Sequence, residues 1–243
     1  DAGHQSEGGG ALGNRRRAES KNAGNALGIA EYQTLDNHDG ELMPSLQVRH
    51  QVIRAIRKWN ADIVLGLRPN DYHPDHRNAG KVVVDASYMV IVPNVCPDTP
   101  PLSKNPLFLY MEDRFDKPYP HEPDVVVAID EVIELKIDGL HAHTSQMYEW
   151  LPWTRGGDAN VATIPTSDKK RREWLSERVK NRSSIGDLLE SNDMNSKKRA
   201  SLIKWYGKDY ANKVKYIESF EVAEYGMQPT DKDLRKFFPM LKK

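Results

Sequence analysis

The chain has 243 residues, and 35 Lys and Arg against 35 Asp and Glu give a formal net charge of zero at pH 7. A net charge of zero provides no overall field to attract nucleic acid or anionic lipid, so we expect no nucleic-acid partner. Cys96 is the only cysteine, which excludes an internal disulfide framework and a cysteine-rich zinc module.

No stretch of the sequence approaches the roughly 18 consecutive apolar residues that a membrane helix needs, and no signal peptide is visible. We therefore expect a cytoplasmic protein without an integral membrane segment. The chain opens at Asp1, without an initiator Met and within a glycine-rich segment. This opening suggests that a further element precedes it.

Residues 1–156 are predicted to alternate between helices, marked by apolar residues at helical spacing, and strands, marked by short apolar runs. In chain order the expected elements are a loop at 1–13, a helix at 15–27, a strand at 31–35, a turn at 37–40, a helix at 46–59, a strand at 62–67, a helix at 75–87, strands at 89–92, 107–111 and 125–129, and a helix at 130–150. This alternation predicts an α/β fold, a Rossmann-like three-layer sandwich with a mostly parallel sheet.

The character of the sequence changes after about Gly156, where apolar periodicity weakens and basic runs appear at 169–172 and 197–199. We expect a mainly helical C-terminal extension over residues 157–243, packed on a domain formed by residues 1–156. Acidic residues are interspersed with the basic runs, so solvated helix faces are favoured over phosphate contacts.

The most informative segment is Arg68-Pro-Asn-Asp-Tyr-His-Pro-Asp-His76, which lies between a predicted buried strand and a predicted helix. Ligands of open α/β sheets bind at the carboxyl ends of strands. Pro74 suits a first helical turn, where its lack of an N–H costs nothing. Two imidazoles and the Asp75 carboxylate in a rigid turn suit hydrolysis at a metal centre. The same residues also fit an exposed polar turn in which Asp75 caps the helix.

This segment resembles the second signature of the PIG-L/LmbE-like deacetylases, and three other segments match that family in the same order. They are the glycine-rich loop with the helix that carries Arg16 and Glu19, the strand at 124–130, and the His-x-Ser-Gln sequence at 143–146. The resemblance covers roughly residues 1–155. It implies a zinc-dependent hydrolase in which zinc-bound water removes the acetyl group of an N-acetylated amino sugar or sugar conjugate.

The resemblance also implies roles for three residues. His76 corresponds to a zinc ligand, His73 to the proton donor or electrostatic partner of the tetrahedral intermediate, and Asp75 to the carboxylate that orients and tunes His73. Zinc is the expected metal, and another divalent ion is an alternative. The first signature of the family, which supplies two more ligands and the base, is expected upstream of residue 1. A strand edge left open by its absence would favour association into a homo-oligomer.

The remaining candidates are substrate contacts, each with a structural alternative. Arg16 would bind a hydroxyl or phosphate of the substrate, or pair with a neighbouring acid. Asp36 and Asn37 would read sugar hydroxyls, or only form a turn. Tyr72 would stabilise an oxyanion or pack as a loop aromatic, and His143 would contact substrate or lie on a helix surface. For the whole protein, the alternative is a non-catalytic sugar-binding or interaction protein of the same fold.

Overall fold

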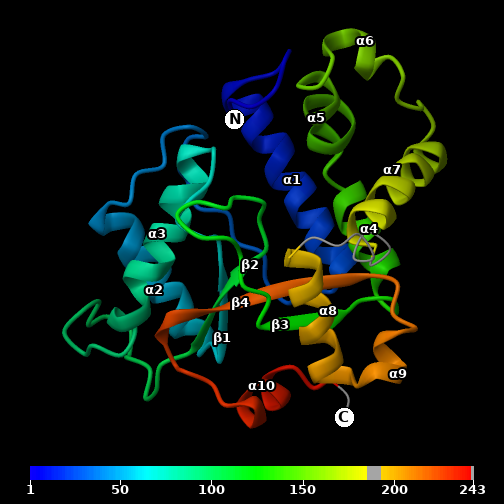
Figure 1. Ribbon diagram of the computed structural model, residues 1–243. Coiled ribbons are helices and arrows are strands. Elements are labelled where there is room, and N and C mark those ends of the chain that lie inside the picture. Colours follow the sequence, from blue (N-terminus) through cyan, green and yellow to red (C-terminus); the bar gives the residue numbers. More distant parts are fainter. Residues whose placement is uncertain (185–192, 242–243) are drawn as a thin grey trace. The chain divides into compact units, whose positions relative to one another are not determined.

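A computed structural model describes residues 1–184 and 193–241 (Figure 1). These residues form two compact units: the first combines Asp1–Gly40 with Ile129–Ser184, and the second combines Glu41–Ala128 with the described residues that follow 192. The expected division at residue 156 partitions the chain differently and stays a prediction. Within the described residues, no helix is both long and apolar enough to cross a membrane.

The first unit is helical. Its elements are α1 (Gly9–Leu27), α4 (Ile133–His141), the π-helical turn η1 (Ser145–Trp150), α5 (Leu151–Trp153), α6 (Gly157–Val161) and α7 (Asp168–Ser183). As predicted, α1 ends before Gly28, whose φ of 68° lies in the left-handed region that glycine adopts readily. The helix begins at Gly9, earlier than expected.

Two predictions for the first unit are wrong. The strand at 31–35 does not form, because Tyr32 packs against α1: a Cβ at Gly24 would lie 3.2 Å from the Tyr32 ring. The single helix at 130–150 is broken between α4 and η1, where the Ser145 N–H donates to the Glu19 carboxylate at 2.9 Å. Both differences arise from contacts with α1, which directly precedes residues 31–35 in the sequence but lies far from residues 130–150.

The second unit contains the strands of the described chain. Its elements are α2 (Leu46–Trp59), β1 (Ile63–Gly66), α3 (Pro74–Met89), β2 (Leu107–Met111), β3 (Val125–Ala128), α8 (Asp193–Tyr206), α9 (Lys208–Ala211), β4 (Ile217–Gly226) and α10 (Asp231–Phe237). The predicted α2, β1, α3, β2 and β3 are confirmed. The strand at 89–92 is wrong, because α3 continues to Met89 and the Val90 N–H donates to the Ala86 carbonyl at 3.1 Å.

Among the described residues, the sheet has four strands in the order β1-β2-β4-β3. β1 pairs in parallel with β2, and β4 pairs antiparallel with both β2 and β3, so β1, β2 and β3 run in one direction. The α/β class is confirmed, and the three-layer arrangement stays a prediction. The described part of the C-terminal region is mainly helical, as expected, but it also supplies the unpredicted strand β4.

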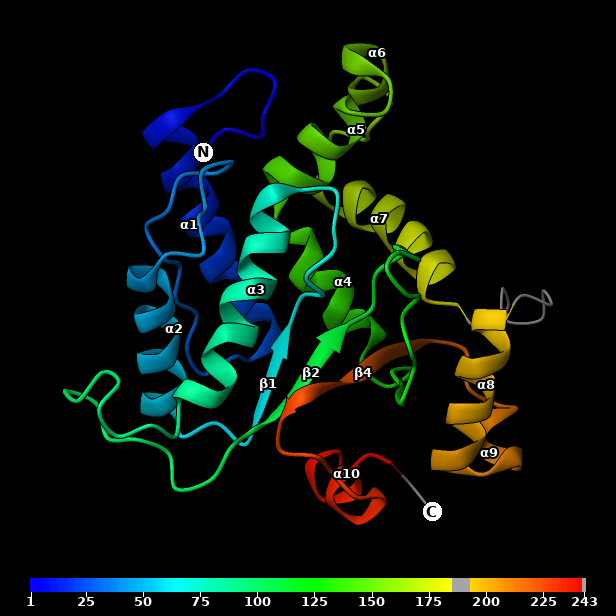
Figure 2. The same cartoon turned by 60° about the vertical axis from the view of Figure 1, so that its left-hand side comes forward.

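Helices α2 and α3 pack against each other and over one face of this sheet (Figure 2). The core between them and the sheet contains Ile53 and Val90 from the helical side and Phe108, Tyr110 and Ala223 from the sheet. Because β1 leads directly into α3, this packing fixes the loop at 67–73 at the carboxyl end of β1.

The close approach of α3 to the end of β1 requires glycine at position 80. A Cβ on Gly80 would lie 2.6 Å from the Leu67 carbonyl oxygen and 3.1 Å from that of Arg68. We expect Gly80→Ala to lower the free energy of unfolding in urea by about 1–3 kcal/mol, because backbone would have to shift. Gly10→Ala, which meets no atom within 4 Å on α1, is the control and should be neutral or slightly stabilising. Equal stability of the two variants would contradict this explanation.

Candidate active site

Asp71 and two histidines converge where β1 ends and α3 begins. The Asp71 carboxylate accepts the His73 backbone N–H at 2.8 Å, and the same oxygen lies 3.1 Å from Nδ1 of His76. One acidic side chain therefore orients both histidine positions. Asp71 belongs to the segment highlighted in the sequence, but no role was predicted for it, because an Asx turn before a helix is a common local feature.

His73 is the N-cap of α3, with Pro74 in the first turn as predicted. Nδ1 of His73 accepts the Asp75 N–H at 3.2 Å. A neutral imidazole whose Nδ1 accepts must carry its proton on Nε2, so Nε2–H is the donor available to a ligand. The alternative in which Asp75 caps the helix is wrong. One Asp75 oxygen accepts the Leu42 N–H at 3.2 Å, and the expected effect of Asp75 on His73 stays a prediction.

The structure also brings the side chains of His73, His76 and Tyr72 together. The two imidazoles stack with 4.7 Å between ring centroids, and the Tyr72 ring stands nearly perpendicular to both of them. His73 and His76 are half-buried, whereas Tyr72 is exposed. The cluster is therefore partly accessible to solvent.

A buried arginine connects the loops that follow β1 and β2. The Arg68 side chain is 1% exposed, and its guanidinium donates to the Asp113 carboxylate at 2.8 Å, to the Phe115 carbonyl at 3.0 Å and to the Tyr119 carbonyl. Its Nε lies 3.7 Å from the Glu221 carboxylate of β4. Sequence reasoning missed this role, because a single Arg after a strand usually lies on the surface.

His121 and Glu221 extend this buried group. Nδ1 of His121 lies 3.5 Å from Glu221, and Nε2 lies 3.1 Å from the Ser219 hydroxyl. Burial lowers the pKa of His121 and raises the pKa of Glu221, because a low-dielectric environment disfavours the charged form of each. Burial therefore acts against charge on both side chains, whereas the Arg68 guanidinium keeps its charge and is paired with the Asp113 carboxylate.

Arg16 and Glu19 tie α1 to η1 within the first unit. Arg16 donates to the Gly3 carbonyl at 2.6 Å and to the Gln146 side chain at 2.9 Å. Glu19 accepts from the Ser145 hydroxyl at 2.7 Å. The Arg-x-x-Glu pair and the His-x-Ser-Gln segment therefore form one hydrogen-bonded group. A contact of Arg16 with substrate stays a prediction.

The other predicted substrate contacts also belong to the first unit. Asp36 is exposed and accepts from Arg17 at 2.7 Å, and Asn37 is exposed in the segment just before the turn at 39–40. His143 is half-buried, and this burial lowers its pKa. An approach of any of these residues to the histidines of the second unit stays a prediction.

The described residues do not by themselves fit a catalytic zinc ion. A catalytic zinc takes three protein ligands, and the described chain contains no group of three or more His, Cys, Asp or Glu side chains placed to hold a metal. Because Nδ1 of His76 faces Asp71, Nε2 is the ring nitrogen of His76 that remains for a metal. His76 is thus a candidate for one ligand of a site that needs others.

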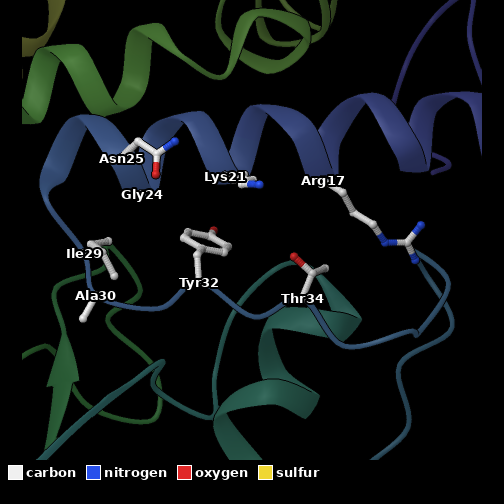
Figure 3. Close-up of a pocket in the computed structure, with 8 residues that line it drawn as sticks. All are labelled: Arg17, Lys21, Gly24, Asn25, Ile29, Ala30, Tyr32 and Thr34. Carbon is white, nitrogen blue, oxygen red and sulfur yellow. The ribbon is translucent and has the colours of Figure 1, made fainter.

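A groove of about 480 Å³ lies elsewhere, between α1 and the segment at 29–34 of the first unit (Figure 3). It is lined by Arg17, Lys21, Gly24, Asn25, Ile29, Ala30, Tyr32 and Thr34. None of the site residues predicted from the sequence lines this groove. Its lining lacks the imidazoles and carboxylates that amide hydrolysis uses, so the candidate active site remains at the end of β1.

Residues 1–87 match the sequence profile of the PIG-L family, which is described as GlcNAc-PI de-N-acetylase. This part of the chain is therefore similar to the PIG-L family, and the match covers less than half of the chain. The PIG-L match includes the whole segment from Arg68 to His76. The diacetylchitobiose deacetylase of Thermococcus kodakarensis is 31% identical in an alignment of 149 residues that covers 58% of this chain and 55% of that protein. The chain thus spans about half the length of this curated relative.

Three solved structures share the fold. N,N'-diacetylchitobiose deacetylase from Pyrococcus horikoshii has a TM-score of 0.61 at 20% identity, over 95% of this chain and 73% of that chain. The conserved protein TT1542 from Thermus thermophilus has a TM-score of 0.55 at 18% identity, over 93% and 79%. GalB, the 4-carboxy-2-hydroxymuconate hydratase from Pseudomonas putida, has a TM-score of 0.56 at 14% identity, over 93% and 78%. The last is a hydratase, so similarity to these structures indicates the fold and does not identify the reaction.

Proposed function

We propose that this protein is an N-deacetylase that hydrolyses the acetamide of an N-acetylated amino sugar or sugar conjugate. The observation that carries the proposal is the stacked pair of His73 and His76 at the carboxyl end of β1, within the part of the chain that matches the PIG-L profile. The deacetylase named among the relatives supports the same reaction class. A cytoplasmic location and self-association remain predictions.

The cap of α3 suggests what His73 does in this reaction. Water that attacks the amide carbonyl leaves a negative charge on the carbonyl oxygen, and a fixed N–H donor stabilises that charge. Since Nδ1 of His73 accepts from Asp75, Nε2–H is the group that would donate to this oxygen. His73 therefore acts as an electrostatic partner of the tetrahedral intermediate, in preference to a proton donor.

Zinc, or another divalent ion, is our proposed cofactor, with His76 as one of its ligands. A metal at this position would act as a Lewis acid toward the amide. Asp71 would keep the His76 ring in place, because its carboxylate faces Nδ1 of that ring at 3.1 Å. Acidic partners of this kind fix the tautomer of a metal-binding histidine.

The test is an assay of acetate release from N,N'-diacetylchitobiose and N-acetylglucosamine, with glucosamine as the control that carries no acetyl group. We expect stoichiometric acetate and free amine, and loss of turnover after treatment with a chelator. Sugar binding without acetate release would support the non-catalytic alternative. Absence of both sugar binding and acetate release would contradict both the deacetylase proposal and the sugar-binding alternative.

A further inference from the structure

Tyr72 is 75% exposed, although its ring belongs to a cluster of four rings. Its centroid lies 5.9 Å from that of His73, 5.7 Å from that of His76 and 6.4 Å from that of Phe115. An aromatic ring exposed to this extent beside candidate catalytic groups is typical of a ligand surface. The reason is that covering its apolar face with a ligand removes that face from water, which lowers the free energy.

The backbones that carry Tyr72 and Phe115 are both held by arginine side chains. Arg77 donates to the Tyr72 carbonyl at 3.1 Å, and the buried Arg68 donates to the Phe115 carbonyl at 3.0 Å. The Phe115 N–H in turn donates to Asp113 at 3.0 Å. The backbone positions from which the two rings project are therefore held in place, which lowers the entropy lost when a ligand binds.

We propose that Tyr72 and Phe115 form an aromatic platform on which a sugar ring stacks next to the reacting acetamide. A pyranose presents a face of C–H groups that packs on an aromatic ring, while its hydroxyl rim needs polar neighbours. Here the platform adjoins the imidazoles of His73 and His76. The inference rests on the proposed deacetylase function, and it assigns the platform a role in sugar recognition, distinct from stabilisation of the oxyanion by the Tyr72 phenol.

Substitutions that keep or remove the ring separate these two roles. We expect Tyr72→Ala to raise KM about threefold to tenfold, the range expected for loss of one aromatic contact, with little change in kcat. Tyr72→Phe keeps the ring and should retain both constants. Tyr88→Ala removes another exposed tyrosine from the last turn of α3 and is the matched control. If Tyr72→Phe lowers kcat as much as Tyr72→Ala does, the hydroxyl carries the function and the platform is refuted.

A binding measurement keeps the platform testable if no acetate is released. In saturation-transfer NMR with N-acetylglucosamine as the probe, transfer to the ring C–H protons should disappear in Tyr72→Ala and persist in Tyr72→Phe. This result without acetate release would retain the platform and overturn the deacetylase proposal. Acetate release with the same KM in wild type and Tyr72→Ala would retain the deacetylase and overturn the platform.

Discussion

Replacement of His73 by asparagine is expected to lower kcat for acetate release by about 10²–10³-fold, the effect of removing one donor to an oxyanion. Asparagine is a good N-cap, so its side chain can accept the Asp75 N–H in place of Nδ1. The variant therefore keeps the cap of α3 and loses only the imidazole Nε2–H. Acetate release and urea unfolding measured together distinguish this loss from a folding defect.

His73→Ala provides the contrast, since it removes both the imidazole and the cap. It should lose turnover to the same degree and also lose about 1 kcal/mol of stability. Wild-type turnover in His73→Asn would show that His73 has only the capping role that it fills in the structure.

His76→Asn is expected to abolish turnover by a different route. If His76 binds the metal, the purified variant should hold far less zinc than wild type after dialysis, whereas His73→Asn should hold the wild-type amount. Elemental analysis measures the bound metal. Equal metal content in the two variants would remove the assignment of His76 as a ligand.

The second large effect is expected at Arg68. Arg68→Met should lower the free energy of unfolding by about 3–5 kcal/mol, because removal of one partner leaves buried acidic groups without their cation. The acidic groups affected are Asp113 at 2.8 Å and Glu221 at 3.7 Å, and the Phe115 and Tyr119 carbonyls also lose their donor. Urea unfolding followed by circular dichroism measures the change.

Arg54→Met is the matched control for Arg68→Met. Arg54 pairs with Asp98 at 2.8 Å on the surface of the same unit, and surface pairs contribute at most about 1 kcal/mol. Arg68→Lys should recover little stability, since a single ammonium group cannot donate to all the acceptors that the planar guanidinium reaches. Similar unfolding midpoints for Arg54→Met and Arg68→Met would contradict the role of the buried guanidinium.

The sequence by itself determined the elements whose signals are local. The α2 helix spans Leu46–Trp59 as predicted, because its apolar residues recur at helical spacing and Ser45 accepts the Val48 N–H as its cap. Local signals in the sequence also predicted the order of β1, the polar loop and α3. It located His73 and His76 at the carboxyl end of a strand, which is why the candidate site was found.

Only the tertiary structure decided which polar residues lie inside. β4 was not predicted, because its buried face includes Ser219 and Glu221, so the strand lacks the apolar alternation that marks a half-buried strand. Those side chains are buried because His121 and Arg68, from distant parts of the sequence, provide their partners. Burial of a polar group depends on such partners, and one sequence pattern does not reveal them.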